Sequence, residues 1–203
     1  MNYRDYAAQY SGHIEAIGGV LYDTVTYLSA ATVGLTAFTV ARANLSLSNM
    51  ELAGQLASPK AFLIRAVRCA ILTVPWSSAR VAAGTIQGGT LNDVAQLLNT
   101  GTMQLLIGNK FYCEFPLWMI PGGTGPFGVM AGDGDVADPG EIQDFGTNGV
   151  PDINNIRALT KPIFIGPQIN FQVNLIWPAA LTLAEGNTDI QITFDGDQLR
   201  PVQ

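Results

Sequence analysis

Charged residues are scarce in this 203-residue chain. Asp, Glu, Lys and Arg make up 13 % of it, whereas soluble domains average about 25 %. Apolar residues make up 48 %, and the mean hydropathy is +0.23. Because a soluble monomer normally covers its surface with charge, we expect much of this surface to lie against partner molecules or lipid.

Positive charge and histidine are scarcer still. The net charge is −6, the sequence pI is about 4.5 and basic residues occur singly, which argues against sequence-independent nucleic-acid binding. His13 is the only histidine, so one chain cannot build the histidine-rich metal cage of cupin-like enzymes. A catalytic triad would depend on His13, beside Gly12. We therefore expect no enzyme, no cofactor and no small-molecule substrate.

Two further absences concern disulfides and export signals. Cys69 and Cys113 lie in apolar segments and form no framework, which favours buried thiols in a reducing compartment. The first ten residues lack an apolar core, so we expect no signal peptide and synthesis in a host cytoplasm. Residues 24–41 are uncharged but contain six Ser or Thr, which favours two strands over a membrane span.

Regular alternation of polarity is what the chain has most of. Residues 169–177 are apolar at every odd position, with amides at the even positions up to Asn174. A second alternating run places apolar residues at Ile190, Ile192 and Phe194. Successive side chains of a strand point to opposite faces. The sequence therefore predicts an all-β, antiparallel β-sandwich with one covered face for each sheet.

Other segments have recognisable patterns. Residues 61–74 form a long apolar run, which predicts a buried strand. The turn at 108–110 separates two apolar runs, 103–107 and 111–120, and predicts a hairpin. Helical spacing over 91–98 predicts a short helix, and we also expect a helical turn at 154–159.

The first 20 residues are expected to form an N-terminal arm. Apolar and aromatic residues recur at steps of three and four, which predicts a helix over about residues 3–10, followed by a looser stretch. Tyr3, Tyr6 and Tyr10 are the candidate interface residues, because tyrosine offers a large apolar area with a polar tip. The alternative, a helix packed on its own domain, remains open.

Residues 124–151 form the largest irregular region, and they hold the only acidic cluster of the chain. Carboxylates two or three residues apart in a Gly-rich loop are able to wrap a calcium ion. The spacing does not match the helix-loop-helix calcium pattern, so a solvated acidic turn is the preferred interpretation. The calcium candidates are Asp133, Asp135 and Asp138, and the cluster also includes Glu141 and Asp144.

The C-terminal third resembles a known family. The run 169–177, Pro178, a loop, and the segments 189–196 and 199–203 resemble the closing strands of single jelly-roll coat proteins of tailless, membrane-containing bacterial viruses. Segment 107–118 has a similar character. The resemblance implies that residues 21–203 form one jelly-roll of two four-stranded sheets, located in the virion and without catalysis. It also implies contact with many copies of the chain, with other coat proteins and with an internal membrane.

Three functions follow as hypotheses. The first is a structural subunit of a viral capsid that assembles with many copies into a shell. The second is an adhesin or carbohydrate-binding module, or a subunit of an extracellular filament. For sugar binding, Trp76 in a turn is the best aromatic platform, Trp118 is another, and Trp177 in an alternating strand is a poor one. The third, ranked last, is a sandwich enzyme that uses the acidic loop.

Overall fold

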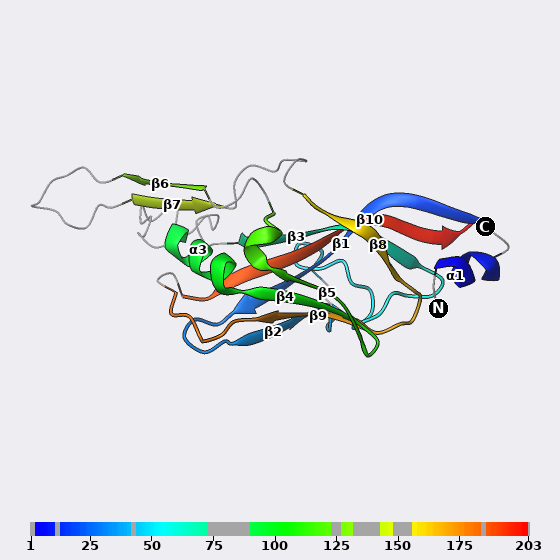
Figure 1. Cartoon of the computed structure of the whole chain (residues 1–203), viewed down its shortest axis with the longest axis horizontal. Coiled ribbons are helices and arrows are strands. Elements are labelled where there is room, and N and C mark those ends of the chain that lie inside the picture. Colours follow the sequence, from blue (N-terminus) through cyan, green and yellow to red (C-terminus); the bar gives the residue numbers. More distant parts are fainter. Residues whose placement is uncertain are drawn as a thin grey trace, which may run out of the picture.

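Two four-stranded antiparallel sheets form a β-sandwich (Figure 1). This confirms the fold class that the alternating segments predict. A two-stranded ribbon and short helices accompany the sandwich. The structure is a computed structural model, and it describes residues 3–10, 13–41, 44–72, 90–122, 127–131, 143–147, 156–183 and 186–202.

The strand order is that of a jelly-roll. Sheet A has the order β1 (Ile14–Tyr27), β10 (Thr188–Pro201), β3 (Ala61–Leu72) and β8 (Arg157–Ile165). Sheet B has the order β2 (Gly34–Ala37), β9 (Phe171–Ile176), β4 (Thr102–Ile107) and β5 (Lys110–Pro116). Of these eight strands the first pairs with the last, the second with the seventh, the third with the sixth and the fourth with the fifth. That nested antiparallel pairing defines a jelly-roll sandwich.

The core lies between the two sheets and uses the predicted alternation. Val173 and Leu175 of β9 are buried there, while Asn174 between them faces outward. Phe194 of β10 stacks on Phe38, with ring centroids 5.0 Å apart. The apolar faces of β9 and β10 thus meet in one core, as a period of two residues requires.

Helix α3 (Thr90–Thr100) packs on the core at one end of the sandwich (Figure 1). It buries Val94, Leu97 and Leu98, which confirms the predicted helix. The predicted hairpin is β4–β5, but its second strand ends at Pro116 and a 3₁₀ helix, η2 (Leu117–Met119), follows. Within the described residues, no helix is long and apolar enough to cross a membrane.

Three predicted segments differ from the structure. The expected loose arm up to residue 20 is wrong, because β1 begins at Ile14 and pairs with β10 along its whole length. The expected helical turn at 154–159 is wrong as well, because β8 begins at Arg157 and pairs with β3. Within the expected irregular region, β6 (Phe127–Ala131) and β7 (Gln143–Thr147) pair as a ribbon. In each case the segment pairs with another strand, which satisfies the hydrogen bonds of its backbone. A local sequence pattern does not reveal such pairing.

Candidate interaction surface

The N-terminal helix packs on the outer face of sheet A of its own chain. Helix α1 (Tyr3–Gln9) buries Tyr6 against Ala61 and Leu199. The Tyr6 hydroxyl donates a hydrogen bond to the carbonyl of Pro59 at 2.7 Å. Burial, with a smaller contribution from Tyr10, raises the pKa of Tyr6. Of the open alternatives, the structure thus shows a helix packed on its own domain.

The three predicted interface tyrosines therefore have different surroundings. Tyr6 is fully buried, Tyr10 is half-buried with its ring 5.2 Å from that of Tyr6, and Tyr3 is exposed. Tyr3 also meets Phe164 of β8 edge-on at 6.0 Å. Only Tyr3 presents a large area to solvent. The helical spacing of the three residues identified their common face. The structure shows that this face lies against sheet A of the same chain, with Tyr3 at its exposed margin.

The tryptophans divide in a similar way. Trp177 is buried, and its indole N–H donates to the carbonyl of Leu97 at 3.1 Å. Its ring meets that of Tyr27 edge-on at 4.8 Å. Trp118, by contrast, is 57 % exposed on η2. Trp76 lies outside the described residues, so Trp118 is the one described tryptophan that can contact a partner.

The acidic cluster cannot be placed as a site. Asp133, Asp135, Asp138 and Glu141 lie outside the described residues, and Asp144 lies on β7 without a described side chain. Among the side chains that the structure does describe, no group of three or more Cys, His, Asp or Glu is arranged to hold a metal ion. The calcium candidates stay a prediction.

The two cysteines are free thiols with raised pKa values. Burial raises the pKa of Cys69 to about 12. Burial also raises the pKa of Cys113 to about 11, although a backbone hydrogen bond with Leu105 lowers it in part. Cys113 borders a groove of about 460 Å³ between the edge strands β5 and β8. Both thiols stay protonated at neutral pH, which suits side chains that pack rather than react.

Charge is concentrated on sheet A. Arg68 of β3 makes a bidentate ion pair with Asp195 of β10, at 2.6 and 2.7 Å. Next to it, Arg65 pairs with Asp197 at 2.5 Å. The cross-strand register between β3 and β10 creates both pairs, so opposite charges on this sheet neutralise each other within the chain.

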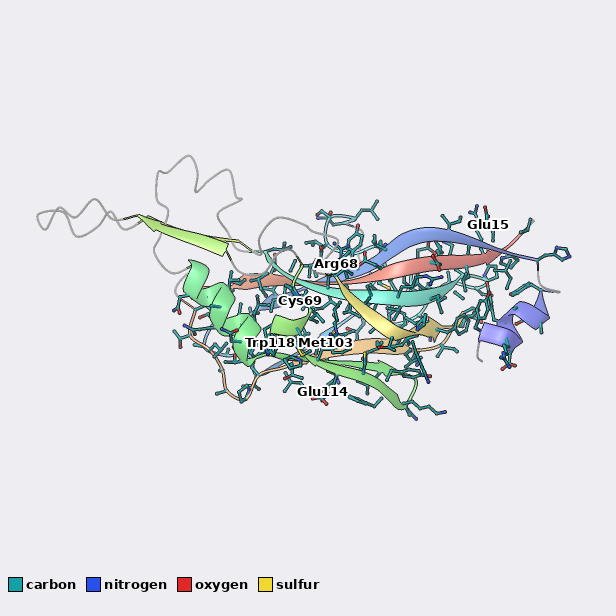
Figure 2. The ribbon with its side chains drawn as sticks, turned by 45° about the horizontal axis from the view of Figure 1, so that its top comes forward. Glu15, Arg68, Cys69, Met103, Glu114 and Trp118 are labelled. Atoms are coloured by element: carbon teal, nitrogen blue, oxygen red, sulfur yellow. The ribbon has the colours of Figure 1, made fainter. Side chains whose placement is uncertain are left out.

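The outer face of sheet B carries amides in place of ion pairs. Strands β2, β4 and β9 contain no charged residue. Asn174 accepts a hydrogen bond from the Gln172 amide at 3.0 Å and one from the Thr36 hydroxyl at 3.5 Å. Figure 2 shows Arg68 and Glu114 on opposite sides of the sandwich. Glu114 belongs to β5, the one strand of sheet B with charged residues.

Large apolar side chains lie at or near this face, on which Glu114 of β5 accepts a hydrogen bond from the Gln104 amide at 3.4 Å. Ile176 lies on β9 directly beside Thr102 of β4, and Val33 precedes β2. Phe111 and Tyr112 lie on the edge strand β5, and Trp118 follows that strand. These side chains are 40–57 % exposed. We call the following set the sheet B surface: Val33, Thr36, Gln104, Phe111, Tyr112, Trp118, Gln172, Asn174 and Ile176.

Sequence reasoning found part of this surface. The amides at 172 and 174 were recognisable as the polar face of a strand, and Trp118 was a candidate platform for sugar binding. The gathering of β2, β4 and β9 into one uncharged face depends on strand register, which no single segment shows. Such a face suits contact with another protein, since few charged groups have to lose their water. Comparison with models of protein families, with curated proteins and with solved structures found no match to this chain.

Proposed function

We propose that this chain is a structural subunit of a viral capsid, which assembles with many copies of itself through the sheet B surface. The observation that carries the proposal is the outer face of sheet B, where β2, β4 and β9 carry no charge and large apolar side chains stay exposed at or near the face. Patches of this kind on a soluble protein mark contact sites. In this proposal the assembled shell, and thus the virion, is where the protein acts.

The energetics favour a repeated contact over a single strong one. Full burial of one large apolar side chain contributes about 1.5–3 kcal/mol. Five side chains that are about half exposed therefore contribute on the order of 5 kcal/mol. Association costs about 4–15 kcal/mol in lost freedom. One such contact is weak alone, but many contacts in a closed shell add up through multivalency.

The fold supports the proposal without deciding it. The nested strand pairing is the architecture found in viral coat domains, and also in lectins and cupins. Strands β9 and β10 are the segments whose pattern resembles coat proteins of bacterial viruses. Because one fold hosts many functions, the surface carries the argument and the fold agrees with it.

A sugar-binding module is the second candidate, and Trp118 favours it. An exposed indole offers a flat apolar platform, and Trp118 is 57 % exposed. This candidate makes a separate prediction. Trp118→Ala should abolish retention on immobilised polysaccharide and leave the size of the protein in solution unchanged, whereas a coat subunit should show no such retention.

The test of the coat proposal is a charge placed at the centre of the sheet B surface. Asn174→Asp keeps the shape and both accepted hydrogen bonds of Asn174, but adds a charge that assembly has to bury. Asn187→Asp is the matched control, because Asn187 is an exposed loop residue whose side-chain oxygen accepts from the Ser29 N–H. We expect large particles from the wild type and the control, and small species from Asn174→Asp.

Sedimentation velocity and electron microscopy of the full chain measure this outcome. A wild-type chain that stays monomeric at every concentration contradicts the proposal. Equal assembly of the two variants contradicts the assignment of the sheet B surface as the contact.

A further inference from the structure

The N-terminal half of β1 is exposed on both of its faces. Residues 15–20 are all exposed, although each of them pairs with a residue of β10. Figure 1 shows this end of the β1–β10 pair reaching past the strands of sheet B. Since β1 is an edge strand of sheet A, one of its two hydrogen-bonding sides faces away from the sheet.

Hydrogen bonds on either side of this half of β1 identify which backbone groups face away from β10. The Tyr22 N–H donates to the Asn49 side chain at 2.9 Å, so the groups of Tyr22 face outward. The His13 carbonyl accepts from the Val202 N–H at 3.1 Å, so odd-numbered residues face β10. Because the direction alternates along a strand, the N–H and C=O groups of Ile14, Ala16 and Gly18 face outward too.

The chain protects one half of this edge and leaves the other half open. The Asn49 amide donates to the Val20 carbonyl at 2.7 Å and covers the edge from there toward Tyr22. The outward groups of Ile14, Ala16 and Gly18 have no hydrogen-bond partner in the described part of the chain. Open strand edges are templates for pairing with another strand.

Two glycines in this half of β1 have open space around them in the described part of the chain. A Cβ atom built on Gly18 meets no atom within 4 Å, and one on Gly19 meets only the Ile17 carbonyl at 3.9 Å. Gly196, opposite Gly19 on β10, differs, since its Cβ would lie 1.9 Å from the Leu63 carbonyl. Glycine weakens a strand interior and often marks the close approach of another backbone. At Gly18, the described part of the chain brings no such backbone within 4 Å.

We propose that the open edge of β1 pairs antiparallel with the same edge of a second copy, about a two-fold axis at Ile17. The two copies of sheet A then form one continuous eight-stranded sheet. The inference deepens the self-assembly proposed above, and it rests on that proposal for the identity of the partner. It supplies a second contact, distinct from the sheet B surface, and makes a dimer the building unit of the assembly.

The sequence of the edge is complementary to itself in this register. Ala16 lies against Gly18 of the partner strand. The outward-facing N–H and C=O groups of the two residues are thus able to hydrogen-bond to each other. Glu15 lies against Gly19, so the large side chain faces the small one. Ile17 lies against itself, and the paired segment ends where Ile14 meets Val20, the residue at which Asn49 begins to cover the edge. Glu15 is the only charged residue of the segment, and Arg200 pairs with it at 2.8 Å, so the edge presents no unpaired charge to its copy.

Ile17→Lys separates the dimer from the fold. Ile17 is exposed in the single chain, so the melting temperature should change little. The dissociation constant of the dimer should rise roughly fivefold or more, because the two-fold axis places two like charges directly opposite each other. Ala158→Lys is the matched control, since it adds the same charge at an exposed position on β8, the opposite edge of sheet A.

A cross-link tests the register. Opposite residues of a non-hydrogen-bonded antiparallel pair have Cα atoms about 4.5 Å apart, close enough for a disulfide after small adjustment. In a Cys113→Ser background, Ile17→Cys should form a disulfide-linked dimer on oxidation. Thr26→Cys, exposed on the same strand outside the contact, should not.

Sedimentation velocity over a range of concentrations, with a non-reducing gel for the cross-link, gives the result. Unchanged dimerisation of Ile17→Lys, or equal cross-linking at positions 17 and 26, overturns the inference. If Ile17→Lys still assembles like the wild type while Asn174→Asp does not, this edge contact is wrong and the proposed function stands. A wild-type chain that never self-associates overturns both.

Discussion

The two outer faces of the sandwich differ, although the two inner faces are alike. Both sheets bury apolar side chains in the shared core. On its outer face sheet A carries cross-strand ion pairs and is partly covered by α1. The outer face of sheet B has neither: three of its strands lack charge and its apolar side chains stay exposed. Alternating apolar residues therefore form the core of both sheets. The residues at the outward positions determine whether a face is covered and charge-paired within the chain, as on sheet A, or stays exposed to a partner, as on sheet B.

The largest effect should come from the two faces of a single strand. Val173→Asp puts an unpaired charge in the core, where Val173 is fully buried, at a cost of about 4 kcal/mol or more. That is a large part of a total stability of about 5–15 kcal/mol. Asn174→Asp changes only the outer face and should leave the fold intact. Soluble yield and a thermal melt measure the difference, and equal loss from both variants would refute the assignment of faces.

The next effect concerns the helix on sheet A. Tyr6→Ala removes a buried ring and should lower the free energy of unfolding by about 3 kcal/mol. Tyr3→Ala alters an exposed ring and should cost less than about 1 kcal/mol. Urea unfolding of both variants provides the measurement. If both cost little but both block assembly, α1 is a contact between copies and not a cover for sheet A.

A smaller effect should distinguish the ion pairs of sheet A. Arg68 and Asp195 are about one quarter exposed, and loss of their bidentate pair through Arg68→Gln should cost about 1–2 kcal/mol. Arg200 and Glu15 are about half exposed, so Arg200→Gln should cost about 0.5 kcal/mol or less. Urea unfolding at low and high salt compares them. Equal losses of stability in Arg68→Gln and Arg200→Gln would contradict the view that the pair of Arg68 and Asp195 stabilises the outer face of sheet A.

Alkaline pH should produce a small effect. Burial raises the pKa of Cys69 to about 12 in the folded protein, above its ordinary value of 9.0. Its contribution to stability is therefore complete below pH 9 and is lost as the pH rises from 9 toward 12. At pH 10 the loss is on the order of 1 kcal/mol. Unfolding curves at pH 8 and pH 10 test this, and Cys69→Ala, although less stable overall, should show a smaller loss between the two pH values.

The sequence predicted the strands whose alternation is regular. Residues 169–177 and 190–194 have one covered face, so their periodicity was sufficient to predict β9 and β10. The first half of β1 was missed because Gly18 and Gly19 interrupt its pattern, and the apolar steps before them fit a helix equally well. β8 was missed because Lys161 and Pro162 interrupt the apolar pattern of this edge strand. Local patterns fail where pairing with a distant strand decides the structure.

The candidate surfaces were less predictable than the fold. Tyr6 has the spacing of an interface residue, but whether its face turns inward depends on where α1 docks. The sheet B surface joins residues from β2, β4, β5 and β9, and only the strand order brings them together. The open edge of β1 concerns backbone groups, which side-chain patterns do not report. Composition did indicate covered surface, and sheet B and the β1 edge are where we propose that it lies.

Hydroxyl-radical footprinting of assembled and dissociated protein tests the central claim most directly, because it reports the solvent exposure of individual side chains. Ile176, Phe111 and Trp118 of the sheet B surface should become protected on assembly. Leu72, exposed at the end of β3, should react equally in both states. Protection of Leu72 without protection of Ile176 would contradict the account and make sheet A the contact.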